Sequence, residues 1–173
     1  MKTNLVKAFV ALFVGVLMVG CGVPTEKDYK DACKDKDWDK AYSIVDEYRE
    51  AAQPHIDEYM RHMINTQKKE CSQAVALLDK YLTGLHYVIL QECVDVIEQG
   101  DQSALIRIPM IIKEHRHSAS SLSSFIDDAV KHHDLSYSDL PDFDIHAELL
   151  DIAKTTGDES LVSRLKTMFG EDE

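Results

Sequence analysis

The sequence contains little of what β-structure requires. It has only seven glycines and four prolines in 173 residues. No stretch shows the alternation of polar and β-branched apolar residues that is typical of a half-buried strand. From Lys27 onward, apolar residues instead recur every three or four positions. The sequence therefore predicts an all-α fold of about six or seven helices, packed as antiparallel hairpins in a bundle or a short helical array.

The sequence also lacks the common motifs of catalysis and cofactor binding. It has no Gly-x-Ser-x-Gly elbow, no His-Glu-x-x-His, no phosphate-binding loop and no dinucleotide fingerprint. Cys33, Cys71 and Cys93 show no Cys-x-x-Cys spacing, which a zinc site would favour. We therefore predict a protein that is not an enzyme and has no cofactor. Cys33, Cys71 and Cys93 are either buried as small apolar residues or contain at most one disulfide.

Positive charge is scarce. The chain has 19 Lys and Arg against 31 Asp and Glu, which gives a formal net charge of -12. Binding to nucleic acid depends on clustered basic residues, so this composition argues against a nucleic-acid partner. A basic or neutral partner is expected instead.

The start of the chain has the pattern of a targeting signal. Lys2 and Lys7 precede 13 uncharged residues, 8–20. This segment is shorter than the about 20 residues of a membrane-spanning helix and is typical of a secretory signal peptide. Its end, Met18-Val19-Gly20-Cys21, resembles the lipobox of bacterial lipoproteins, although the family more often has leucine at the Met18 position. An ordinary secretory signal followed by a chance cysteine is the alternative.

The lipoprotein resemblance implies cleavage after Gly20 and attachment of diacylglycerol, with further acylation such as palmitate, at Cys21. Two or three acyl chains would hold the protein stably on a membrane. Loss of residues 1–20, which contain two lysines and no acid, changes the formal net charge from -12 to -14. Gly22 stands where an aspartate commonly retains such proteins at the inner membrane, so the resemblance favours the outer membrane, on either its periplasmic or its surface-facing side.

The rest of the chain then divides into two parts. Residues 21–26 are the lipidated cysteine and a short spacer. Residues 27–173 form one all-α domain, long enough to bury its own core.

Several helices are predicted from apolar stripes and caps. Residues 56–64 contain one stripe, including Tyr59 and Met60, that should face the core. A second stripe over residues 74–97 fits one long helix or a hairpin at Thr83-Gly84. Pro109 predicts a short turn followed by a helix, or a kinked helix.

The last third of the body has clearer boundaries. The serine-rich residues 118–124 are interpreted as containing the start of a capped helix, and residues 135–144 as a loop. Asp144 is expected to cap a helix over residues 145–155. The final helix is expected to begin at Asp158.

Three segments share one pattern, in which a helix stop is followed by an aspartate and a new helix: Lys36-Asp37-Trp38, Gly100-Asp101-Gln102 and Gly157-Asp158-Glu159. An aspartate at a helix start accepts hydrogen bonds from free backbone N–H groups, so the pattern predicts hairpin turns. The first copy, continued to Pro54, resembles the second half of a tetratricopeptide repeat, with Trp38 as its turn aromatic and Ala41 as its packing alanine. The resemblance implies a TPR-like body that binds peptides on a concave face; three unrelated caps in a plain bundle are the alternative.

Aromatic residues concentrate near the start of the body. Tyrosine and tryptophan are favoured at interfaces because they bury a large rigid area and keep a polar tip. We therefore predict a groove near Trp38, Tyr42 and Tyr48 that binds another envelope protein or a peptide. Core packing of Tyr42 and Tyr48 beside Val45 is the alternative.

A second class of function would use histidines. A small-ligand or metal site is the alternative prediction, in the region of His115, His117, His132 and His133. Glu114 and His117 stand at i and i+3 on one helix face, which resembles half of a carboxylate-bridged di-metal site. The second Glu-x-x-His of such a site is missing. A polar surface of histidines and acids explains the same residues without a metal.

Overall fold

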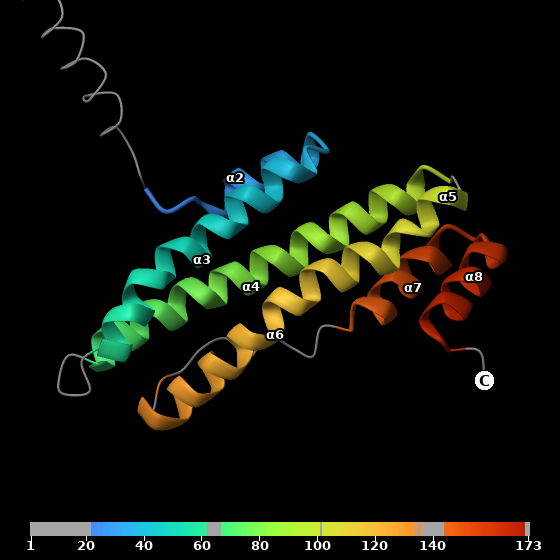
Figure 1. Ribbon diagram of the computed structural model, residues 1–173. Helices are drawn as coiled ribbons and strands as arrows, with labels where there is room; N and C mark the ends of the chain where they lie inside the picture. Colours follow the sequence, from blue (N-terminus) through green and yellow to red (C-terminus); the bar gives the residue numbers. More distant parts are fainter. Residues whose placement is uncertain (1–21, 62–66, 101, 134, 136–143, 172–173) are drawn as a thin grey trace, which may run out of the picture.

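The computed structural model describes residues 22–61, 67–100, 102–133, 135 and 144–171, and for part of these only the backbone. This part of the chain contains seven helices and no strand, so the predicted all-α class is confirmed (Figure 1). The helices are α2 (Glu26–Lys34), α3 (Trp38–Arg61), α4 (Gln67–Glu98), α5 (Gln102–Leu105), α6 (Arg107–His133), α7 (Ile145–Thr155) and α8 (Glu159–Phe169).

Helix α4 is the centre of the molecule. Helices α3 and α6 run along α4 in the opposite direction, and α2 lies against α3 and α4 (Figure 1). Helix α7 packs against α4, away from α2, and α8 packs against α7. The core follows the apolar stripe of α4, where Leu78, Tyr81 and Val88 are fully buried. A TPR repeat places two helices in about 34 residues, whereas α4 alone has 32 residues. The described part of the chain is therefore a bundle built on three long helices, α3, α4 and α6.

Gly84 lies inside α4, so the hairpin alternative at this residue is wrong. A Cβ at position 84 would lie 3.0 Å from Val45 Cγ2 and 3.4 Å from Tyr29 Cε1. The missing side chain thus lets α2 and α3 approach α4 closely. This packing offsets the cost of about 1 kcal/mol that glycine carries in a helix.

Helix α6 begins two residues before Pro109, after the short helix α5, in agreement with the predicted turn and helix. Proline is tolerated there because the first turn of a helix has no intrahelical partner for its N–H groups. The predicted helix start within residues 118–124 is wrong, since α6 runs through them without interruption. The apolar stripe explains this continuity, because it passes from Ile112 through Ala119 to Leu122 and Ile126 at helical spacing.

The stripe over residues 56–64 is only partly core. Ile56 and Tyr59 are half-buried, but Met60 is 67% exposed, so its predicted place in the core is wrong. Ala52 is the last buried residue of α3, and Ile56 and Tyr59 pack against the edge of the core. Met60 is the last residue but one of α3 and lies about two turns beyond Ala52, past the buried part of the helix. Met63 and Ile64 lie outside the described residues.

The three predicted turns share a backbone feature. Lys36, Gly100 and Gly157 all have positive φ, of 58°, 64° and 71°. Asp37 then accepts a hydrogen bond from Lys40 N at 3.2 Å, and Asp158 accepts one from Leu161 N at 3.0 Å. The predicted caps are confirmed at these two turns, while Asp101 lies outside the described residues.

The predicted start and end of α7 are also confirmed. Asp144 accepts hydrogen bonds from the N–H groups of His146 and Ala147, and the helix covers Ile145–Thr155. Residue 135 is described, but residues 136–143 of the predicted loop are not. The start of this helix could be predicted from one local rule, that an aspartate satisfies the free N–H groups of the first turn.

Cys33, Cys71 and Cys93 are buried free thiols. Burial raises the pKa of Cys33 to about 11 and that of Cys93 to about 12, so little thiolate forms near neutral pH.

We expect the folded Cys21→Ser protein to react very slowly with a thiol reagent at pH 8, and three thiols to react after denaturation. Fast reaction of the folded protein, or fewer than three thiols after denaturation without reductant, would contradict this assignment.

Candidate binding groove

A groove of about 1010 Å³ lies where α3, α4 and α6 meet. It joins residues that are far apart in the sequence, from the first three turns of α3 to the start of α6. Its lining is Trp38, Asp39, Tyr42, Ser43, Asp46, Glu47, Glu50, Glu92, Arg107, Met110, Ile111, Glu114 and His115. The structure thus brings two of the three predicted aromatic residues, Trp38 and Tyr42, into one concave surface.

Tyr42 is held by contacts to two other helices. Its ring stacks on the ring of His115 from α6, with centroids 3.9 Å apart and planes within 11° of parallel. Its hydroxyl donates a hydrogen bond to Glu92 Oε2 of α4 at 2.7 Å. Burial, and then the bond to the Glu92 carboxylate, raise the pKa of this hydroxyl far above its usual range. Tyr42 is therefore a protonated donor with a fixed ring, and its core packing and its place in the groove are compatible.

Glu92 is a buried carboxylate at the base of the groove. Only 7% of the residue is exposed. A buried charge is costly unless other groups compensate it. Besides the Tyr42 hydroxyl, Arg107 approaches, with Nη2 3.6 Å from Glu92 Oε1 and more than half of its side chain exposed. A guanidinium of the chain itself therefore already lies beside this carboxylate.

The groove is strongly negative. Six of its lining residues are acids, and Arg107 is its single Lys or Arg residue. Apolar surface adjoins these charges, since Met110 is 65% exposed and Trp38 is half-buried. Such a surface is complementary to a positively charged group that carries apolar carbon, as lysine and arginine side chains do.

His115 adds an imidazole with a lowered pKa to the groove. Burial lowers its pKa below the usual value of about 6.5, although Glu114 of α6, Glu92 of α4 and Asp46 of α3 each oppose this shift. The ring stacked on Tyr42 is therefore neutral at pH 7. Protonation would place a positive charge in the groove.

This histidine should make the folded protein less stable in mild acid. Because its pKa is lower in the folded chain than in the unfolded chain, its contribution is complete above a pH of about 6.5 and is lost as the pH falls through the folded pKa. We expect the free energy of unfolding, measured with urea between pH 7.5 and 5, to fall less steeply for His115→Gln than for the unchanged protein. Parallel pH curves would show that His115 does not titrate in this way.

Tyr48 does not belong to the groove. It is 3% exposed, and its hydroxyl donates a hydrogen bond to the carbonyl oxygen of Pro24. Six residues separate it from Tyr42, which places it about 240° around α3. The core alternative is therefore correct for Tyr48, and its predicted role in partner binding is wrong.

The groove also contains residues that sequence reasoning missed. Glu92, Arg107 and Met110 line it, and Glu114 and His115 belong to it rather than to a metal site. One signal was present in the sequence, because Glu92 and Asp95 stand within the apolar stripe of α4 and both are buried. An acid on a core-facing stripe indicates a specific polar partner.

The predicted histidine region does not form one site. His115 and His132 lie about 26 Å apart along α6, given a rise of about 1.5 Å per residue. His133 instead contacts the Tyr59 hydroxyl at 3.1 Å, and the side chain of His117 lies outside the described part. Within the described residues, no three His, Cys, Asp or Glu side chains are placed to hold a metal ion.

The predicted lipidation site, Cys21, lies outside the described residues, as do residues 1–20. None of the helices that the structure describes has the length and apolar character needed to cross a membrane.

No protein-family model, curated protein or solved structure matches this chain.

Proposed function

We propose that this protein is a lipid-anchored envelope lipoprotein that is not an enzyme and binds a basic protein segment or peptide in its groove. The observation that carries this proposal is the fixed Tyr42–His115 stack inside an acid-lined groove. An aromatic face surrounded by carboxylates favours lysine or arginine through cation–π contact and charge complementarity. The exposed Met110 and the half-buried Trp38 supply apolar contact beside it.

The anchor is supported by the sequence alone. The segment Met18-Val19-Gly20-Cys21 has the form of a lipobox, and Gly22 favours the outer membrane. Anchoring would keep the groove at the envelope, where its partner is another envelope protein or a peptide. Its acidity makes a nucleic-acid partner unfavourable.

The decisive experiment is photo-crosslinking of the lipidated protein in its native envelope. A photoreactive residue at Met110 should give one prominent crosslinked partner, whereas the same residue at Glu159, exposed on α8, should not. The Trp38→Ala/Tyr42→Ala double variant, with the fold verified by circular dichroism, should lose this crosslink. An unchanged crosslink in that variant would exclude the groove as the binding site.

The sign of the partner's charge can be tested separately. Glu50→Lys reverses one charge in the groove, and Glu159→Lys makes the same change outside it. We expect Glu50→Lys to weaken binding of the crosslinked partner at least about tenfold, which corresponds to about 1.4 kcal/mol, because like charges at an interface repel each other. Glu159→Lys should have little effect, and equal effects of the two variants would indicate only a general influence of net charge.

A further inference from the structure

The chain that follows the proposed lipidation site is fixed to the body of the protein. The buried Tyr48 hydroxyl donates a hydrogen bond to the Pro24 carbonyl oxygen. The backbone N–H and the hydroxyl of Thr25 both donate to Asp28 Oδ2, at 2.6 and 2.8 Å. Only residues 22–25 lie between Cys21 and α2, so two of these four residues are held by the fold.

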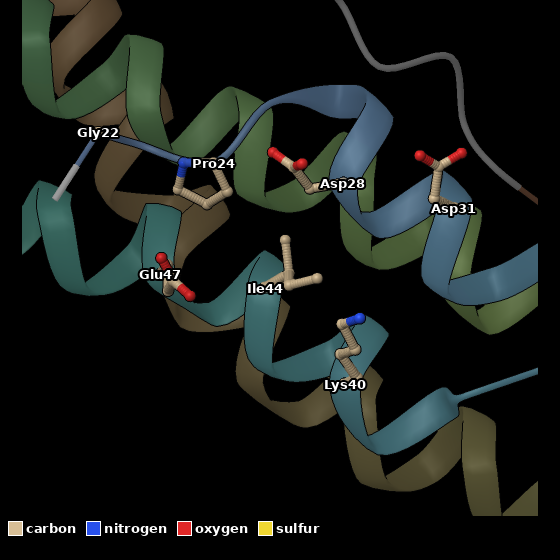
Figure 2. A pocket seen from close by; sticks show the side chains of 7 residues that line it. All are labelled: Gly22, Pro24, Asp28, Asp31, Lys40, Ile44 and Glu47. Carbon is tan, nitrogen blue, oxygen red and sulfur yellow. The ribbon is translucent and has the colours of Figure 1, made fainter. Parts of the chain in front are cut away.

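These residues close one end of a hollow between α2 and α3. The hollow has a volume of about 400 Å³, and Gly22 and Pro24 line it together with Asp28, Asp31, Lys40, Ile44 and Glu47. In Figure 2 the two aspartates lie on α2, while Lys40, Ile44 and Glu47 lie on α3, and the segment from Gly22 to Pro24 crosses at one end. The first described residue after Cys21 therefore belongs to the wall of this hollow.

We propose that this hollow and the helix surfaces around it lie against the lipid headgroups, so that the anchor holds the body in one orientation. The inference rests on the proposed lipidation of Cys21. One residue of extended chain spans at most about 3.6 Å, so a lipidated Cys21 keeps the membrane surface close to Gly22. A long free tether would allow the body to turn, but residues 24 and 25 are held by hydrogen bonds, so within the described spacer only residues 22 and 23 precede the fixed part.

The charges of the hollow select the kind of lipid surface. Glu47 attracts the ammonium groups of zwitterionic headgroups, and Asp28 does so beside its hydrogen bonds to Thr25, whereas Asp31 is paired with Lys27. Lys40 attracts the phosphates. A bilayer rich in anionic phosphatidylglycerol would instead repel Glu47 and Asp28. The surface that fits is zwitterionic, of the phosphatidylethanolamine type.

This orientation leaves the binding groove accessible. Trp38 and Tyr42 line the groove, whereas Lys40 and Ile44 line the hollow. A difference of two residues places the two pairs about 200° apart around α3. Glu47 lines both and marks the border between them. A partner can therefore enter the groove while the hollow faces the membrane.

Spin labels can test the orientation, because the three native cysteines are buried. Lipidated protein is placed in vesicles of phosphatidylethanolamine and phosphatidylcholine that contain a nickel-chelating lipid, with one label at Asp31→Cys in the hollow or at Ser43→Cys in the groove. We expect the nickel lipid to broaden the spectrum at position 31 at least about fivefold more than at position 43. Equal broadening at the two positions would overturn the proposal.

Two further variants test whether the fixed tether causes the orientation. Tyr48→Phe removes only the hydroxyl that binds Pro24, and insertion of Gly-Ser-Gly-Ser after Gly22 adds slack without changing the body. Both should reduce the difference between positions 31 and 43, and an unchanged difference in the insertion variant would overturn the fixed tether. In vesicles with phosphatidylglycerol the broadening at position 31 should fall, and an increase would overturn the zwitterionic assignment.

The proposed lipidation is tested apart from the orientation. Mass spectrometry should find acyl chains on Cys21. The Cys21→Ser variant should not bind to the vesicles. Missing acyl chains would remove the anchor on which both proposals rest. Acyl chains together with equal broadening would reject the orientation alone and leave the groove unaffected.

Discussion

Replacement of Gly84 by leucine is expected to lower the free energy of unfolding by about 3 kcal/mol, the upper part of the range for an overpacked core. Even a Cβ at this position would lie 3.0 Å from Val45 Cγ2, which is fully buried. A leucine side chain therefore has to separate α3 from α4, and α2 lies against both helices through Tyr29. Urea denaturation measures the effect.

Thr83→Leu is the matched control, since Thr83 is the exposed neighbour of Gly84 on α4. Leucine favours the helix more than threonine does, so this variant should be neutral or slightly stabilised. Gly84→Ala should gain up to about 1 kcal/mol of helix propensity but lose part of it to the close contact. Similar stability of Gly84→Leu and Thr83→Leu would show that the helices do not approach closely at Gly84.

Trp38→Ala is expected to weaken binding of the basic partner at least about 30-fold. Truncation of a central tryptophan at an interface commonly costs 2 kcal/mol or more, and about 1.4 kcal/mol corresponds to a factor of ten. Trp38 is half-buried at the start of α3 and lines the groove. Titration calorimetry with the partner identified by crosslinking measures the change.

Tyr87→Ala is the control for this prediction. Tyr87 is also a half-buried aromatic residue, but it contacts Tyr29 and does not line the groove. Its loss should change stability more than affinity, while Trp38→Phe should keep much of the binding through its remaining ring. Equal loss of affinity in Trp38→Ala and Tyr87→Ala would point to a general disturbance of the fold.

Much of the fold could be predicted from local rules. The caps at Asp144 and Asp158 fix helix starts because a nearby carboxylate satisfies free N–H groups, and this depends on only a few residues. The stripe of α4 predicted a buried face because helical spacing alone brings those residues to one side. The same rules could not decide whether Gly84 ends a helix, because the answer depends on Val45, 39 residues earlier in the chain.

The candidate site was predicted only in part. Trp38 and Tyr42 could be proposed from residue type, but Tyr48, which is equally suited by type, proved to be a core residue. The rotation of α3 about its own axis, which is set by packing against neighbouring helices, decides which aromatic residues face the groove. Glu92, Arg107 and His115 reach Tyr42 only through the packing of α4 and α6 against α3.

The sequence by itself determined the helical class, several helix boundaries and the acidity of the body, because each follows from composition or from neighbours within about four residues. The form of the proposed lipidation signal is likewise a local pattern of residues 18–21. Only the tertiary structure decided the continuity of α4 through Gly84, the burial of Tyr48 against Pro24 and the assembly of the groove. These features depend on contacts between helices, and such contacts are set by the packing of side chains that lie far apart in the chain.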